Sequence, residues 1–79
     1  MEREIQLRED VLNELRRDPA IDATRMSVAV KYGVVTLTGY VASYRERHAA
    51  KEATRRIYGV KAIADELDIK LAVPMRTEI

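Results

Sequence analysis

Residues 26–41 of the chain read MSVAVKYGVVTLTGYV. Apolar residues take every second position over 26–30 and again over 35–41, where Gly39 stands in for one of them. A period of two is that of a half-buried β-strand, and two such runs joined by a short glycine-containing turn indicate a β-hairpin. Gly33 supplies the positive φ angle that such a turn needs. The sequence therefore predicts a hairpin of two strands, residues 26–31 and 34–41.

The segment before the hairpin has the period of an amphipathic helix. Its apolar stripe consists of Ile5, Leu7, Val11, Leu12 and Leu15. Asp18-Pro19 ends the pattern, because proline disfavours helical geometry in the residue that precedes it. We therefore expect a helix over residues 4–17.

A second helix is predicted after the hairpin, where Ser43-Tyr44-Arg45-Glu46 has the form of a capping box. In this motif the serine oxygen accepts a backbone N–H, and the Glu46 carboxylate reaches back to the N–H of Ser43. The helix is expected to extend to about Tyr58 and to end at Gly59 in a left-handed stop. Its predicted buried stripe is Ala49, Ala53 and Ile57, with Ala50 beside them. Such small residues allow close approach to a sheet, and Gly39 is the expected point of approach.

The last element is a strand over residues 63–71, where apolar and polar residues alternate again. Asp65 falls on the apolar side of this strand, and we expect it near the strand's start, where water still reaches it. Residues 72–79 have no pattern and are interpreted as a tail or a linker. The domain is therefore predicted to span residues 4–71.

These elements give the order α-β-β-α-β. The second and third strands flank a helix and should run parallel with a right-handed crossover, whereas the hairpin strands pair antiparallel. The predicted fold class is α+β, a three-stranded mixed sheet with two helices packed on one face. The opposite face, which can stand in water or dock a neighbouring protein, would show Ser27, Ala29, Thr36, Thr38, Tyr40, Ala62 and Ala64.

Composition excludes several classes of protein. The chain has 79 residues, enough for one small domain, with 14 Lys and Arg against 13 Asp and Glu. This near-neutrality excludes a bulk polycation that wraps nucleic acid. Cysteine is absent, so disulfides and thiolate metal sites are excluded as well. The first residues lack the apolar core of a secretory signal, which predicts a cytoplasmic protein for the sequence as written.

In order and spacing, the motifs resemble the BON domain, a bacterial module named for osmotically induced and nodulation-related proteins. The matching positions are Val11-x3-Leu15-x2-Asp18-Pro19-x-Ile21-Asp22, Val28-x-Val30-x2-Gly33-x-Val35-x-Leu37-x-Gly39-x-Val41, Ala49-x3-Ala53, Gly59-Val60 and Leu67. The resemblance implies an α-β-β-α-β fold, binding to phospholipid surfaces, and an envelope or periplasmic context connected with osmotic protection if the chain is part of a longer one. It implies no catalytic residues.

The second helix carries the candidate binding site on the side opposite its predicted buried stripe. The candidate residues are Tyr44, Arg47, His48, Lys51, Arg55 and Tyr58. On a helical wheel no carboxylate interrupts this face, and Glu52 lies on a flank, where it can pair with Arg56. Basic side chains near an anionic membrane contribute about 1 kcal/mol each, and tyrosines suit the interfacial region. The face is therefore interpreted as a headgroup-binding surface, with the solvated outer face of an ordinary amphipathic helix as the alternative.

Other functions are weaker. His48 is the only histidine and cannot form a closed zinc site without other ligands, so we expect no metal, no cofactor and no enzyme. RNA binding of the KH type needs a GxxG loop, which is absent, so no nucleic-acid partner is expected. An anionic phospholipid surface is the predicted partner of a monomer or weak dimer. A protein-docking module that uses the outer sheet face is the alternative.

Overall fold

The structure, a computed structural model, describes residues 2–70. Its elements are α1 (Glu2–Arg17), the short 3-10 turn η1 (Ala23–Arg25), β1 (Met26–Lys31), β2 (Val34–Val41), α2 (Tyr44–Arg55) and β3 (Ala62–Ile69). The predicted α+β class and α-β-β-α-β order are confirmed. Both hairpin strands have the predicted bounds. The last strand begins one residue earlier than predicted and ends at Ile69, before Lys70. Leu71 and the predicted tail lie outside the described residues.

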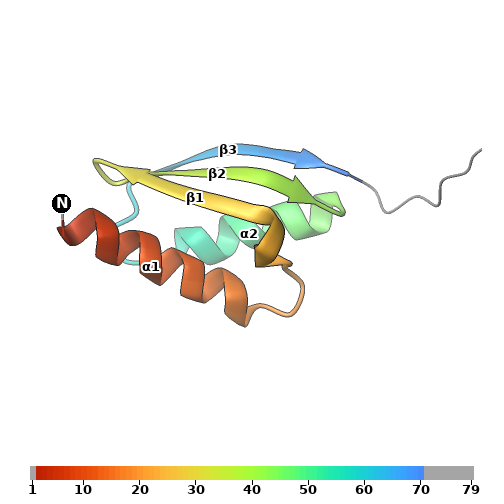
Figure 1. Cartoon of the computed structure of the whole chain (residues 1–79), viewed down its shortest axis with the longest axis horizontal. Helices are drawn as coiled ribbons and strands as arrows, with labels where there is room; N and C mark the ends of the chain where they lie inside the picture. The colour runs from red at the N-terminus through yellow and green to blue at the C-terminus, as the bar shows by residue number, and fades with distance from the viewer. Residues whose placement is uncertain (1, 71–79) are drawn as a thin grey trace, which may run out of the picture.

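The sheet has the strand order β1-β2-β3, so β2 is the central strand. β1 pairs with β2 antiparallel and β2 pairs with β3 parallel, as predicted. Figure 1 shows α1 and α2 on the same face of this sheet, so the core lies between one layer of helices and one layer of strands. The buried apolar side chains are Val11, Leu15, Ile21, Met26, Val28, Val35, Leu37, Val41, Ala50, Ala53 and Leu67.

The hairpin turn uses two residues of positive φ rather than one. Gly33 has φ +81°, as expected, and Tyr32 before it has φ +54°. Two consecutive positive φ angles are the pattern of a type I′ turn, whose twist matches that of the strands it joins. The backbone N–H of Tyr32 also donates to Glu4 Oε2 at 2.6 Å, which ties the turn to the first turn of α1.

In α1 the predicted apolar stripe is too wide. Val11 and Leu15 are fully buried, but 62% of Ile5 is exposed. Two residues along a helix turn through about 200°, so Ile5 and Leu7 point in nearly opposite directions. Ile5 therefore lies outside the face that packs on the sheet.

In α2 the buried face is rotated from the predicted one. The buried residues are Glu46, Ala50, Ala53 and Thr54, whereas Ala49 and Ile57 are only half-buried. An apolar pattern misses this face because two of its positions are polar. Thr54 can be buried because its hydroxyl donates to the Ala50 carbonyl at 2.8 Å.

The predicted end of α2 is also wrong. The helix ends at Arg55, because Ile57 N–H donates to the carbonyl of Thr54, three residues back, and the helical repeat of four is lost. The approach of the alanines to Gly39 stays a prediction. A Cβ at Gly39 would collide with the Arg25 carbonyl oxygen and lie 3.0 Å from Met26 Cα, so the junction between η1 and β1 lies close to this glycine.

Candidate functional site

The first turn of α2 is fixed by a cap that differs in part from the predicted one. Ser43 Oγ accepts the N–H of Glu46 at 3.1 Å, as predicted. The Glu46 carboxylate, however, does not accept the N–H of Ser43. Its two oxygens instead accept the N–H of Ala42 and that of Asp22, each at 2.7 Å. Glu46 thus joins the helix to the segment before β1, and both of its nearly buried oxygens are satisfied.

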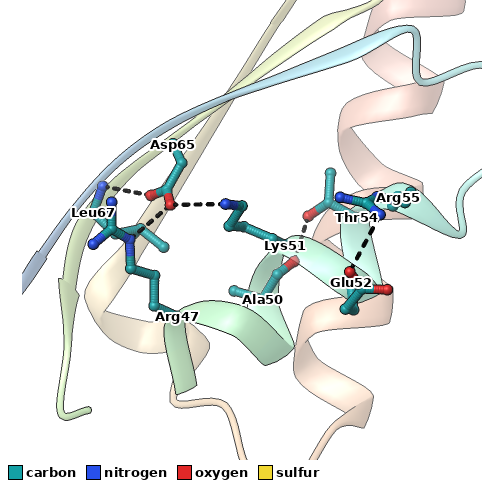
Figure 2. A network of polar contacts seen from close by, with 8 residues as sticks. All are labelled: Arg47, Ala50, Lys51, Glu52, Thr54, Arg55, Asp65 and Leu67. Carbon is teal, nitrogen blue, oxygen red and sulfur yellow. Dashed lines mark hydrogen bonds and ion pairs between the residues drawn. The ribbon is translucent and has the colours of Figure 1, made fainter. Parts of the chain in front are cut away.

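Asp65 lies at the fourth position of the eight-residue strand β3, with a side chain only 10% exposed. Figure 2 shows its carboxylate facing two cations of α2. Oδ2 lies 2.7 Å from Arg47 Nε and 3.7 Å from Lys51 Nζ, while Oδ1 accepts the N–H of Leu67 at 3.1 Å. The expectation of a solvated acid at the strand's start is therefore wrong. An acid can occupy the apolar side of β3 because α2 supplies its counter-charges.

The electrostatics of this cluster favour the ionised carboxylate. Burial by itself raises the pKa of Asp65. The hydrogen bonds from Arg47 and Leu67, together with the charges of Arg47 and Lys51, more than offset burial and hold the pKa of Asp65 below its ordinary value. Asp65 is consequently charged at neutral pH and neutralises part of the basic face of α2.

The predicted basic face is thus divided. The side chains of Arg47 and Lys51 are 36% and 39% exposed and face Asp65, whereas that of Arg55 is 67% exposed. Arg55 pairs with Glu52 at 3.4 Å, so the expected pair of Glu52 with Arg56 is wrong. Two carboxylates therefore contact a face that was expected to have none. A helical wheel omits Asp65 because this residue belongs to another element.

The remaining candidates face solvent. Tyr44 is 75% exposed and His48 is exposed, and both lie on the outer line of α2 with Arg55, since their spacings of four and seven residues return to one side of a helix. Tyr58 is 99% exposed but lies in the turns after the helix rather than on it. The outer surface of α2 therefore presents a tyrosine, a histidine and an arginine, with a second tyrosine beyond its C-terminal end.

An open groove lies beside the C-terminal end of α2. It has a volume of about 340 Å³ and is lined by Lys51, Arg55, Val60, Lys61, Ala62 and Ile63. Lys61 was not among the residues predicted from the sequence. The parallel crossover was the available signal, because it brings the end of a helix and the start of the next strand to the same side of the sheet.

The outer face of the sheet has the predicted small and polar character. Ser27, Ala29, Tyr40 and Ala62 are exposed, and Thr36, Thr38 and Ala64 are half-buried. Lys70 Nζ lies 4.4 Å from the centre of the Tyr40 ring, a cation–π contact at one end of this face. No helix formed within residues 2–70 covers it.

Two kinds of feature are absent from the described part of the chain. Among residues 2–70, no cluster of three or more His, Asp or Glu side chains is arranged to hold a metal ion. In the same range, no helix combines the length and the apolar character needed to cross a bilayer.

Comparison with known proteins bears on the whole fold. A comparison with curated proteins gives no match. The model of the BON domain matches residues 4–70, which include every helix and strand described above except the first two residues of α1. BON domains are known as a binding type of domain, linked at the level of the family to phospholipids and osmotic stress. The chain belongs to the BON domain family.

Proposed function

We propose that this domain associates with anionic phospholipid surfaces through the outer side of α2 and the turns that follow it. The setting we propose is that of the family, the bacterial envelope or the response to osmotic stress. The domain acts as a binding module without catalysis.

The observation that carries the proposal is the pairing of exposed tyrosines with an exposed cation. Tyr44 and Tyr58 are 75% and 99% exposed, and the Arg55 side chain between them in sequence is 67% exposed. Large exposed side chains that combine an apolar ring with a polar tip suit the boundary between headgroups and acyl chains. His48 is also exposed on this side of the helix.

The six predicted residues contribute unequally to this association. Arg47 and Lys51 share the charge of Asp65, and so they offer less to a membrane than their position on the helix suggests. Each cation that remains available contributes about 1 kcal/mol near an anionic surface. A few such contributions give weak binding that falls as the Debye length shortens from ~10 Å at 0.1 M salt to ~3 Å at 1 M.

Vesicle co-sedimentation at low salt tests this proposal. Vesicles of phosphatidylglycerol and phosphatidylcholine are compared with vesicles of phosphatidylcholine alone, and the Arg55→Glu variant is compared with the parent. Arg16→Glu is the matched control, because Arg16 is an exposed arginine in the last turn of the other helix. We expect sedimentation with the anionic vesicles only, reduced by Arg55→Glu and by Tyr44→Ser and much less by Arg16→Glu.

Substitutions at exposed positions separate a loss of binding from a loss of folding. Glutamate at position 47 or 51 would place a second carboxylate beside Asp65 and would disturb the fold as well as the binding. Equal losses for Arg55→Glu and Arg16→Glu would contradict a role for α2 and indicate only an effect of net charge. If the parent protein binds no vesicles, the outer sheet face becomes the better candidate, and with it a role in protein docking.

A further inference from the structure

We propose that the groove at the C-terminal end of α2 is a binding site for a phosphate group, held by Lys51, Arg55 and Lys61. This inference deepens the proposed membrane association. It rests on that proposal only where the phosphate belongs to a lipid headgroup. The groove differs from the outer line of α2 in being concave, and half of the residues that line it are cations.

The charge of the groove is uneven in a way that favours an anion. None of its six lining residues is a carboxylate. Lys51 shares Asp65 with Arg47, which lies 1.0 Å closer to the shared oxygen, at 2.7 Å against 3.7 Å. One carboxylate thus faces two cations, and Lys51 is only partly neutralised. Arg55 has a partner, Glu52, at 3.4 Å, whose side chain is 39% exposed. Ion pairs that water reaches contribute little free energy, so an anion can displace Glu52 from Arg55 at small cost.

Lys61 supplies the third charge from a fixed backbone position. Its N–H donates to the Gly33 carbonyl at 2.8 Å, which holds it next to the hairpin turn. Its Cγ and Cδ atoms pass where a side chain at position 33 would stand, 2.9 Å from an ideal Cβ there. Glycine at position 33 therefore leaves room for the Lys61 stem. None of the ion pairs found among residues 3–70 involves Lys61, so its charge is available.

One force opposes the site. The C-terminal end of a helix carries roughly half a negative charge, which repels anions. Part of this end is already occupied, since the carbonyls of Glu52 and Thr54 accept the N–H groups of Arg56 and Ile57. The three positive charges of Lys51, Arg55 and Lys61 exceed the partial negative charge that remains at this end of the helix, so the net attraction is for an anion.

The lining also indicates what is attached to the phosphate. Val60, Ala62 and Ile63 form the apolar part of the groove. A phosphate ester with an apolar portion satisfies both kinds of lining, whereas a bare anion uses only the cations. The phosphate can come from a lipid headgroup or from a soluble phosphate ester, and the two sources are separated by experiment.

The first arm titrates inorganic phosphate into the isotopically labelled full chain, with ionic strength kept constant by sodium chloride, and follows backbone amide shifts. We expect saturable shifts at residues 51, 55 and 60–63. Lys61→Gln should weaken binding about fivefold, the factor that corresponds to one cation at an anionic group. Lys70→Gln, the same change at the other end of β3, should leave it unchanged. Glu52→Gln should strengthen binding, because it removes the competing carboxylate from Arg55.

The second arm measures co-sedimentation with phosphatidylcholine vesicles that contain phosphatidic acid or phosphatidylglycerol. A greater loss for Lys61→Gln with phosphatidic acid, whose phosphate is terminal, supports a lipid source. Phosphate shifts in the groove without vesicle binding support the site with a soluble ester as ligand, and they overturn the proposed function instead. The site is overturned if phosphate causes no amide shifts in the groove and if Lys61→Gln and Lys70→Gln bind vesicles equally well. In that case the proposed membrane association is still supported.

Discussion

The cations near the middle of α2 and those at its C-terminal end differ in how deeply their counter-charges are buried. Near the middle of the helix, Arg47 and Lys51 face Asp65, whose side chain is 10% exposed. At the C-terminal end, Arg55 faces Glu52, whose side chain is 39% exposed, and Lys61 lies nearby in the groove. Arg47, at 2.7 Å from Asp65, helps to hold α2 on β3. Lys51, at 3.7 Å, is only partly neutralised, and together with Arg55 and Lys61 it remains available to a ligand. The comparison teaches that the burial and the distance of the counter-charge, rather than the cation itself, separate a structural cation from a binding one.

The largest effect is expected for Leu37→Ala, which sets the scale for the interior near Asp65. Leu37 is fully buried in the central strand and is the register partner of Asp65 on β3. Loss of a buried leucine side chain costs about 2–5 kcal/mol of unfolding free energy, because a cavity remains. Urea denaturation measures this change. A loss below about 0.5 kcal/mol would be that of an exposed site and would place Leu37 outside the core.

A smaller loss of unfolding free energy is expected when the carboxylate of Asp65 is removed, and a smaller one still for that of Glu52. Asp65→Ala leaves Arg47 and Lys51 without their shared partner and removes an acceptor from the Leu67 N–H, for which we expect a loss of about 1–3 kcal/mol. Glu52→Ala removes only an exposed pair and should cost less than about 0.5 kcal/mol. Both losses come from the same denaturation experiment. Equal losses would show that the Asp65 cluster is no more structural than a surface ion pair.

Acid should reduce the difference in unfolding free energy between the parent protein and Asp65→Asn. Because the pKa of Asp65 in the folded chain is held below its ordinary value, its ionised form stabilises the fold. This contribution is fully present above the unfolded-state pKa of about 3.9 and is lost as the pH falls through the folded value. The gap in unfolding free energy between the parent and Asp65→Asn should therefore be constant from pH 7 to 5 and shrink toward pH 3. A gap that widens in acid would contradict the sign of the shift.

Much of the fold could be predicted because it depends on patterns within single elements. The alternation over residues 26–41 gave the bounds of β1 and β2, and Asp18-Pro19 marked the end of α1. The site was harder to predict from the sequence, because its chemistry depends on contacts between elements. The Asp65 cluster joins β3 to α2, Glu46 joins α2 to the N–H of Asp22, and Lys61 reaches the groove through the crossover. The pattern of apolar residues also fails to identify the buried face of α2, because Glu46 and Thr54 on that face are polar.

The separation of structural from available cations is tested most directly by co-sedimentation of Arg47→Gln and Arg55→Gln with anionic vesicles at low salt. Each variant loses one arginine charge from the same helix, so a membrane that responds to net charge alone treats them equally. We predict that Arg55→Gln loses more binding than Arg47→Gln, because the Arg47 charge is already matched by Asp65 at 2.7 Å. Equal losses, or a greater loss for Arg47→Gln in a variant that remains folded, would contradict the account.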